Sequence, residues 1–200
     1  MSESTEHPRT GAAIRSPRIV AKRKNVRDRI LVTGGRLLAE RGLAQVSVED
    51  ILAEAKVSRR TFYGYFANKY ELVASIINPA LAEGTRILAE AARQSPERLL
   101  PGIVDCYLSL WESQRDALSA IASLEPGVMP YVESDHRKFG AALKQLLALA
   151  EKAGVLRNND ANYTFRIITR TAVPLLKIYA DHPEGQSLYR EAMLALLGKG

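Results

Sequence analysis

The chain of 200 residues contains almost no cysteine, and its single cysteine, Cys106, stands alone. One cysteine excludes an internal disulfide framework and a cysteine-based structural zinc site. No stretch approaches the roughly 20 apolar residues that a membrane span needs, and the N-terminal segment lacks the apolar core of a signal peptide. We therefore expect an unexported protein of the cytoplasm that has no membrane partner.

Sequence motifs of catalysis are also missing. The three histidines, His7, His136 and His182, are scattered, and Cys106 lies in an apolar stretch without a basic residue nearby in sequence. The chain contains no GxSxG nucleophile elbow and no GxxxxGK phosphate loop. These absences argue against an enzyme, and we expect no catalytic residue, no metal site and no cofactor.

Charge is present in both signs but is unevenly distributed. Residues 1–70 contain 14 Lys and Arg against 7 Asp and Glu, whereas residues 71–200 contain 14 against 15. The whole excess of positive charge, +6 for the chain, therefore lies in the first third. This segregation is typical of an element that binds a polyanion, although a solvated basic tail is an alternative interpretation.

Apolar residues recur mainly at helical spacing, and no window shows the alternation of a β-strand. Residues 1–22 mix Ser, Thr, Pro, Gly and Arg without apolar periodicity, which predicts a mobile tail. Pro79 is expected to kink or break the helix that contains it. We predict an all-α protein of about nine helices, at about 25–42, 47–56, 58–66, 69–94, 97–113, 115–124, 130–153, 160–180 and 184–197.

The second and third of these segments form a recognisable motif. Ser47 is a candidate N-cap with Asp50 three residues later, which is an acidic variant of the capping box. Ser58 is a second N-cap, and only "AKVS" separates it from the preceding helix. Two short helices joined by a tight turn predict a helix-turn-helix, whose second helix enters the major groove of DNA.

The stretch "SRRTFYGYF" carries two arginines and four aromatic residues. Phe62 and Phe66, four residues apart, share one helix face and are predicted to be core. Arginine suits bidentate contact with guanine, and hydroxyl groups and lysines suit phosphates. A solvated helix start and tyrosines that merely cover a small core are the alternatives. The predicted DNA-contacting residues are Ser47, Lys56, Ser58, Arg59, Arg60, Thr61, Tyr63, Tyr65 and Lys69.

The basic residues of the tail could add a further contact. A basic arm that precedes a DNA-binding domain can enter an adjacent minor groove. If the tail is only solvated, its removal leaves DNA affinity unchanged. The residues concerned are Arg15, Arg18, Lys22, Arg23 and Lys24.

Residues 27–73, "RDRILVTGGRLLAERGLAQVSVEDILAEAKVSRRTFYGYFANKYELV", resemble the N-terminal DNA-binding domain of the TetR family of bacterial transcriptional regulators. A helix that ends at a glycine, a serine that caps the next helix, "VS", "TFY" and "NK" follow in the family's order and spacing. Two positions depart from the common pattern. Lys56 stands where the turn usually has glycine, and Tyr65 stands where histidine is frequent.

This resemblance implies a domain organisation and a partner. We expect a flexible basic tail at 1–22, a helix-turn-helix domain at 23–69 and a helical effector-binding and dimerisation domain at 70–200. It also implies a homodimer through the last two helices that binds a palindromic operator in double-stranded DNA within the bacterial nucleoid. The apolar residues available for that interface, some of which must instead bury inside the monomer, are Ile167, Ile168, Leu175, Leu176, Tyr179, Leu188, Met193, Leu196 and Leu197.

The resemblance further implies a small-molecule effector of unknown identity. Pro79 and Gly84 lie in the helix that would transmit its binding. We expect a repressor that the effector releases from DNA; the alternative is an architectural or partner-recruiting factor without an effector. A cavity would favour the first, and a filled core the second. Candidate pocket residues, for which ordinary core is the alternative, are Tyr107, Trp111, Met129, Phe139 and Phe165.

Overall fold

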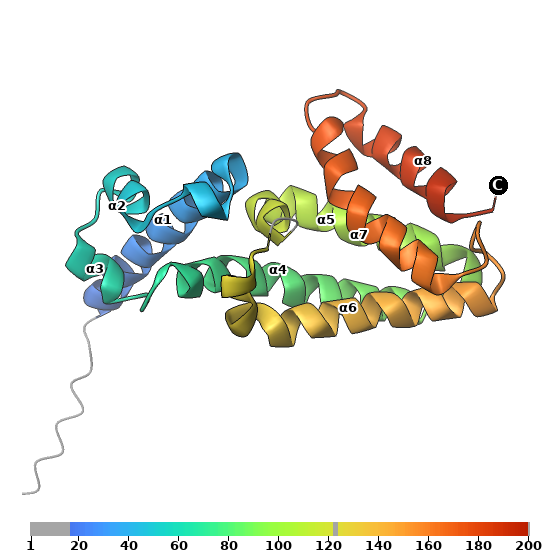
Figure 1. Cartoon of the computed structure of the whole chain (residues 1–200), viewed down its shortest axis with the longest axis horizontal. Coiled ribbons are helices and arrows are strands. Elements are labelled where there is room, and N and C mark those ends of the chain that lie inside the picture. The colour runs from blue at the N-terminus through green and yellow to red at the C-terminus, as the bar shows by residue number, and fades with distance from the viewer. Residues whose placement is uncertain (1–16, 122–123, 200) are drawn as a thin grey trace, which may run out of the picture.

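A computed structural model describes residues 17–121 and 124–199 of the chain. Within these ranges the protein consists of α-helices and two short 3-10 helices and contains no β-strand, so the predicted all-α class is confirmed (Figure 1). In chain order the elements are α1 (Pro17–Arg41), η1 (Leu43–Gln45), α2 (Val48–Ala55), α3 (Arg59–Tyr63), α4 (Lys69–Ala91), α5 (Pro96–Ile121), η2 (Pro126–Val128), α6 (Met129–Lys152), α7 (Ala161–Ile178) and α8 (Gly185–Leu197).

The first helix begins earlier than its apolar pattern predicts. α1 starts at Pro17, so residues 17–22, which we expected to belong to a mobile tail, are helical. Residues 1–16, the rest of the predicted tail, lie outside the described residues. Proline is favoured at the first position of a helix, and the Ala, Lys and Arg residues that follow have high helix propensity. The helix can therefore extend beyond the apolar stripe that anchors it.

The first of two hydrophobic clusters lies where α1, α2, α3 and the start of α4 meet, at one end of the molecule (Figure 1). Its largest side chains are at most 1% exposed, because the helices approach from several directions around them. Val128 of η2 and Val132 of α6 belong to the same cluster. The principal members from the four N-terminal helices are Leu37, Ile51, Phe62, Phe66 and Leu72.

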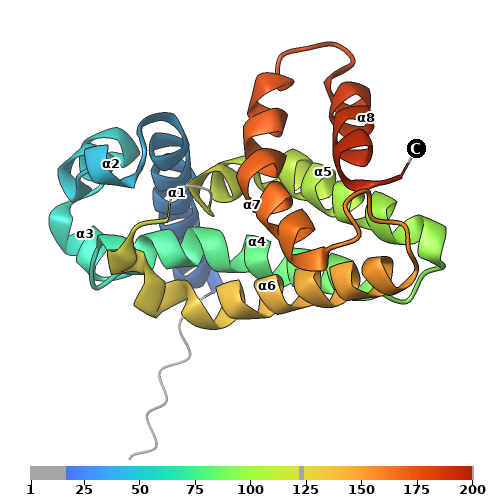
Figure 2. The same ribbon diagram turned by 45° about the vertical axis from the view of Figure 1, so that its right-hand side comes forward.

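The second cluster fills the space between the later part of α4 and helices α5 to α8. Figures 1 and 2 both show α4 and α6 lying side by side, with α7 and α8 at the end of the molecule remote from α3. A short bridge between Leu156 and Gly198 ties the end of α8 to the connection between α6 and α7. The last helix is therefore held to the body and is not a loose extension.

Helix α4 belongs to both clusters. Leu72 and Leu81 lie in the first cluster, whereas Ala80 and Leu88 lie in the second. The predicted boundary between residues 69 and 70 falls at the first turn of this helix, so a continuous helix connects the two parts of the molecule. The division at this boundary stays a prediction, but a movement of α4 would be felt in both clusters.

Two predicted interruptions have different outcomes. Gln114 has non-helical backbone angles (φ −145°, ψ 43°), so α5 bends where we expected one helix to end and the next to begin. Within the described ranges, the nine predicted segments therefore correspond to eight α-helices, because the predicted segments 97–113 and 115–124 are both part of α5. Pro79, in contrast, does not break α4, since packing of the helix on both sides outweighs one missing backbone hydrogen bond.

Candidate nucleic-acid interface and apolar cavity

The start of α2 is fixed by the predicted capping box, which the structure confirms. The Ser47 hydroxyl accepts a hydrogen bond from the Asp50 backbone N–H at 3.1 Å, and the Asp50 carboxylate accepts one from the Ser47 N–H at 2.8 Å. The hydroxyl and the N–H of Ser47 hold the pKa of Asp50 below its usual value. Ser47 is thus committed to capping, and the first turn of α2 is held in place.

The turn after α2 contains a lysine in an unusual backbone conformation. Lys56 has φ 52° and ψ 50°, the left-handed region that residues with a Cβ atom rarely adopt. Glycine, the usual residue here by the resemblance, adopts this region without a steric penalty. The turn therefore keeps its geometry at an energetic cost, and it leaves the Lys56 side chain exposed beside α3.

Helix α3 is short and has two unlike faces. Ser58 caps it by accepting a hydrogen bond from the Thr61 N–H at 3.1 Å. Phe62 and Phe66 are 0% and 1% exposed, with ring centroids 5.6 Å apart, which confirms that they are core residues. Tyr63 is 47% exposed on the other face. The helix start thus presents polar groups outward while its phenylalanines anchor it.

The two arginines of α3 are in different states. Arg59 forms an ion pair with Glu49 of α2, and both side chains are exposed. Arg60 is also exposed, and within the described part of the chain its guanidinium has neither an ion pair nor a side-chain hydrogen bond. Arg60 keeps its donors available for base edges or phosphates, whereas Arg59 must first leave Glu49.

Two residues expected to contact phosphates have intramolecular contacts instead. The Tyr65 hydroxyl donates to the Arg23 carbonyl at 3.1 Å, which ties the end of the helix-turn-helix to α1. The Lys69 ammonium donates to the carbonyls of Leu43 and Val46 at 2.9 and 2.8 Å, where it closes the connection between α1 and α2. In the free protein both side chains are structural, and their contacts with DNA stay predictions.

Two basic residues of α1 lie beside this surface, and sequence reasoning missed one of them, Arg27. The Arg23 guanidinium lies 5.7 Å from the centroid of the Tyr65 ring, and that of Arg27 lies 5.6 Å from the centroid of the Phe66 ring. We assigned Arg23 to a minor-groove arm, whereas it belongs to a helix that packs against the motif. The helix-favouring residues after Pro17 were the available signal.

A cavity of about 330 Å³ lies in the body, between α4, α5, α6 and α7. Its wall is mostly apolar and aromatic, and His136 and Thr169 are its polar exceptions apart from the Tyr107 hydroxyl. Three of the five predicted pocket residues line it: Tyr107, Phe139 and Phe165. This volume and lining suit a small, largely apolar molecule.

The other two predicted pocket residues lie elsewhere. Trp111 lines an open groove beside the connection between α7 and α8, and the Arg115 guanidinium lies 4.6 Å from the centroid of its ring. Met129 packs against the first hydrophobic cluster. Aromatic and sulfur-containing residues in these helices fill several places, and only the three-dimensional packing decides which of them face a cavity.

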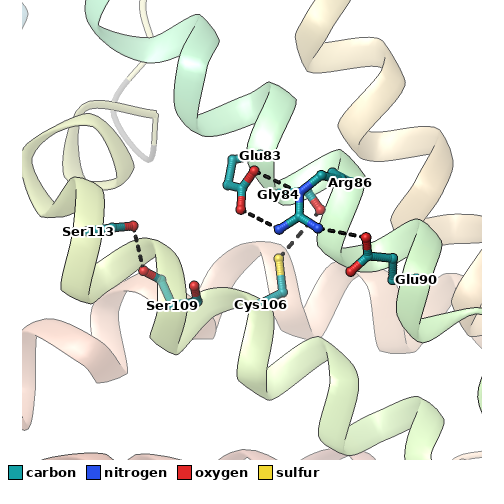
Figure 3. A network of polar contacts seen from close by, with 7 residues as sticks. All are labelled: Glu83, Gly84, Arg86, Glu90, Cys106, Ser109 and Ser113. Atoms are coloured by element: carbon teal, nitrogen blue, oxygen red, sulfur yellow. Dashed lines mark hydrogen bonds and ion pairs between the residues drawn. The ribbon is translucent and has the colours of Figure 1, made fainter.

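Close packing joins the cavity wall to α4. A Cβ atom added at Gly84 would lie 2.5 Å from Phe139 Cε2, so the glycine lets this ring approach the helix. Figure 3 shows the other side of the contact, where the Cys106 thiol donates to the Gly84 carbonyl at 3.6 Å. Burial raises the pKa of Cys106 to about 12, so the thiol stays protonated and is no nucleophile.

The ion pairs on the outer side of α4 are also visible in Figure 3. Arg86 bonds Glu83 and Glu90, each at 2.6 Å, along the exposed surface of the helix. The hydrogen bond from Arg86 holds the pKa of Glu83 below its usual value. No cluster of three or more potential metal ligands lies among residues 17–121 and 124–199, and no helix described there is long and apolar enough to cross a membrane.

A capped helix-turn-helix with an exposed basic start, joined by a continuous helix to an all-helical body, defines the class of helix-turn-helix transcriptional regulators. Comparison with protein families agrees, since residues 30–76 match the family model "Bacterial regulatory proteins, tetR family". The chain belongs to this family, as the resemblance of residues 27–73 implies.

Individual relatives extend the similarity beyond the motif. The transcriptional repressor Rv3405c of Mycobacterium tuberculosis is 32% identical over 141 residues, which span 66% of this chain and 72% of that protein. The regulator EthR of Mycolicibacterium smegmatis is 34% identical over 87 residues, or 42% of this chain and 40% of that protein. These relatives are regulators, which fits the expectation that this chain is not an enzyme.

A solved structure extends the likeness of fold over most of the chain. The complex of SmeT, a repressor of Stenotrophomonas maltophilia, with triclosan has a TM-score of 0.60 and 21% identity, and it covers 88% of this chain and 92% of SmeT. At this identity the likeness concerns the fold alone.

Proposed function

We propose that the chain is a homodimeric repressor that binds a palindromic operator and leaves it when a small molecule occupies the cavity. The observation that carries the ligand-responsive part is the apolar cavity of about 330 Å³ in the body, remote from α3. A factor without an effector has no need of such a cavity. SmeT, which has the same fold, has been solved with the small molecule triclosan, and this supports the same reading.

The dimer rests on the apolar surface of the last two helices. Ile178 of α7 is 71% exposed, Tyr163 is 60% exposed, and Leu196 of α8 is 42% exposed, although these helices are otherwise packed on the body. Burying such side chains against a partner copy is favourable. Four residues that we considered for the interface, Ile168, Leu176, Met193 and Leu197, are at most 3% exposed and belong to the monomer core instead.

The recognition surface consists of the α3 start and its neighbours. Arg60, exposed and without an intramolecular partner in the described chain, reads base edges, while Tyr63, Thr61 and Lys56 hold the helix on the phosphates. A dimer with a two-fold axis presents two such helices to successive turns of DNA. An inverted repeat is the operator that this symmetry requires.

Helix α4 transmits the ligand signal in this proposal. Phe139 lines the cavity, touches Gly84 of α4 and packs against both hydrophobic clusters. A ligand that moves this ring changes the position of α4, and the DNA-binding end follows because α4 forms part of its core. The ligand releases DNA only if it binds the non-binding arrangement more tightly than the other.

The test has two parts. Selection of random duplexes by the purified protein should enrich an inverted repeat, and light scattering should give a mass of two chains; a single half-site bound by a monomer would contradict the proposal. A ligand screen then compares the wild type with Gly140→Leu. Gly140 lines the cavity, and no atom lies within 4 Å of a Cβ added there, so the new side chain has room. Compounds that release the wild type but not this variant locate the effector in the cavity.

A further inference from the structure

The rim of the cavity differs in charge from its interior. His136 of α6 and Thr169 of α7 line the cavity and are both exposed, so the cavity reaches the surface beside these two helices. In α6 no acidic residue occurs from His136 to Ala150, and in α7 none occurs from Ala161 to Ile178. Each of these segments contains three basic residues. These segments therefore carry more basic than acidic residues, although Glu133 and Asp135 lie just before His136.

One of these basic groups is held at the aromatic wall. The Lys144 ammonium lies 5.0 Å from the centroid of the Phe165 ring, and Phe165 lines the cavity. No ion pair satisfies Lys144 in the described part of the chain, whereas Arg137 and Lys138 of the same helix pair with Glu133 and Asp135. Lys144 is thus an available cation beside the opening.

From this geometry we infer that the ligand of the cavity is a small aromatic compound with one acidic group. Its apolar ring occupies the space lined by Tyr107, Phe139 and Phe165, and its carboxylate lies at the rim against Lys144. A carboxylate that bonds a charged ammonium gains a strong hydrogen bond there, while a cationic compound is repelled. This inference rests on the proposed function, and it adds the chemical class of the effector.

The experiment uses three probes with the same ring: 2-naphthoate, neutral 2-naphthamide and cationic 2-naphthylmethylamine. Binding is measured by calorimetry and by the shift in melting temperature, and release from the selected operator is measured by fluorescence anisotropy. We expect 2-naphthoate to bind about tenfold more tightly than the amide, as one charge-assisted hydrogen bond allows. The amine should bind most weakly.

Three variants make the result specific. Lys144→Gln should remove most of the advantage of 2-naphthoate over the amide while the affinity for the amide stays unchanged. Lys152→Gln, in which an exposed lysine at the far end of the same helix is replaced, is the matched control and should preserve the advantage. Gly140→Leu should abolish the binding of all three probes, because it fills the space that the ring needs.

The outcomes separate this inference from the proposed function. Three outcomes would overturn the acidic ligand class. They are equal affinity of the wild type for 2-naphthoate and 2-naphthamide, an unchanged preference of Lys144→Gln for 2-naphthoate over the amide, and no binding of any of the three probes. The sensor function would survive this if a neutral compound from a wider screen released the wild type, but not Gly140→Leu, from DNA. If no compound of any class did so, the ligand-responsive function itself would fail.

Discussion

The DNA-binding end of the molecule and its helical body are stabilised in different ways. In the first region, short helices are fixed by local polar contacts, such as the capping hydrogen bonds of Ser47 and Ser58, around two fully buried phenylalanines. In the body, long helices pack through apolar side chains and leave a cavity among them. The first arrangement keeps the surface around α3 rigid. The second leaves space among the helices of the body for a small molecule.

The largest expected effect contrasts a phenylalanine from each region. Phe62→Ala should lower the free energy of unfolding by about 3–5 kcal/mol, since it empties a fully buried site. Phe139→Ala should cost less than about 2 kcal/mol, because its ring is only partly buried and already borders a cavity. Denaturant unfolding followed by circular dichroism measures both. Equal losses of unfolding free energy in the two variants would contradict the contrast between the filled core around Phe62 and the cavity beside Phe139.

The next effect concerns DNA binding and leaves the body untouched. Arg60→Ala should weaken binding to the selected operator by about 1–3 kcal/mol and relax base preference at one position. Arg59→Ala is the matched variant and should cost less, since Arg59 is paired with Glu49 in the free protein. Glu49→Gln should strengthen binding by releasing that arginine. Fluorescence anisotropy on operator variants checks all three. If Arg59→Ala lost more DNA affinity than Arg60→Ala, Arg59 and not Arg60 would be the main base-reading arginine.

A smaller effect compares the two non-glycine residues that have positive φ among the described residues, one in each region. Lys56→Gly should raise the free energy of unfolding by up to about 1 kcal/mol, because glycine relieves the left-handed strain at φ 52°. Asn159→Gly, at φ 51° between α6 and α7, should gain less because asparagine tolerates this conformation. Thermal unfolding gives both values. If Lys56→Gly lowered the free energy of unfolding, the lysine side chain would stabilise the fold by more than its left-handed backbone conformation destabilises it.

The smallest effect is a pH dependence confined to the DNA-binding end. The folded pKa of Asp50 is depressed by its hydrogen bonds from Ser47, so these bonds stabilise the fold above the unfolded value, near pH 4, and lose that contribution as the pH falls through the folded value. The stability advantage of the wild type over Ser47→Ala should therefore be constant at neutral pH and shrink below about pH 4. Urea titrations from pH 3 to 7 test this, and an advantage that keeps its full size down to pH 3 would contradict it.

The sequence predicted best where contacts are local. The helix-turn-helix, its two serine caps and the inward position of Phe62 and Phe66 follow from residues three or four apart, because such spacing alone brings groups together on a helix. The bend at Gln114 was also expected at the correct place. The match to the family model covers the same stretch.

Contacts between distant residues were not predictable in this way. In the free protein Lys69 closes a connection more than 20 residues away, and Tyr65 bonds a carbonyl of α1; neither contact follows from local spacing. Of five candidate pocket residues, Trp111 and Met129 lie outside the cavity. Nothing in the local pattern distinguishes an aromatic residue that fills a core from one that lines a space.

By itself the sequence determined the all-helical class, the position of the DNA-binding motif and its charge, since helix propensity, capping and the segregation of lysine and arginine are properties of neighbouring residues. The tertiary structure alone decided that α4 joins both clusters, that Gly84 lets Phe139 approach it, and that a cavity forms between α4, α5, α6 and α7. These features depend on how whole helices cross, and the crossing is settled by many weak packing contacts that no single motif encodes.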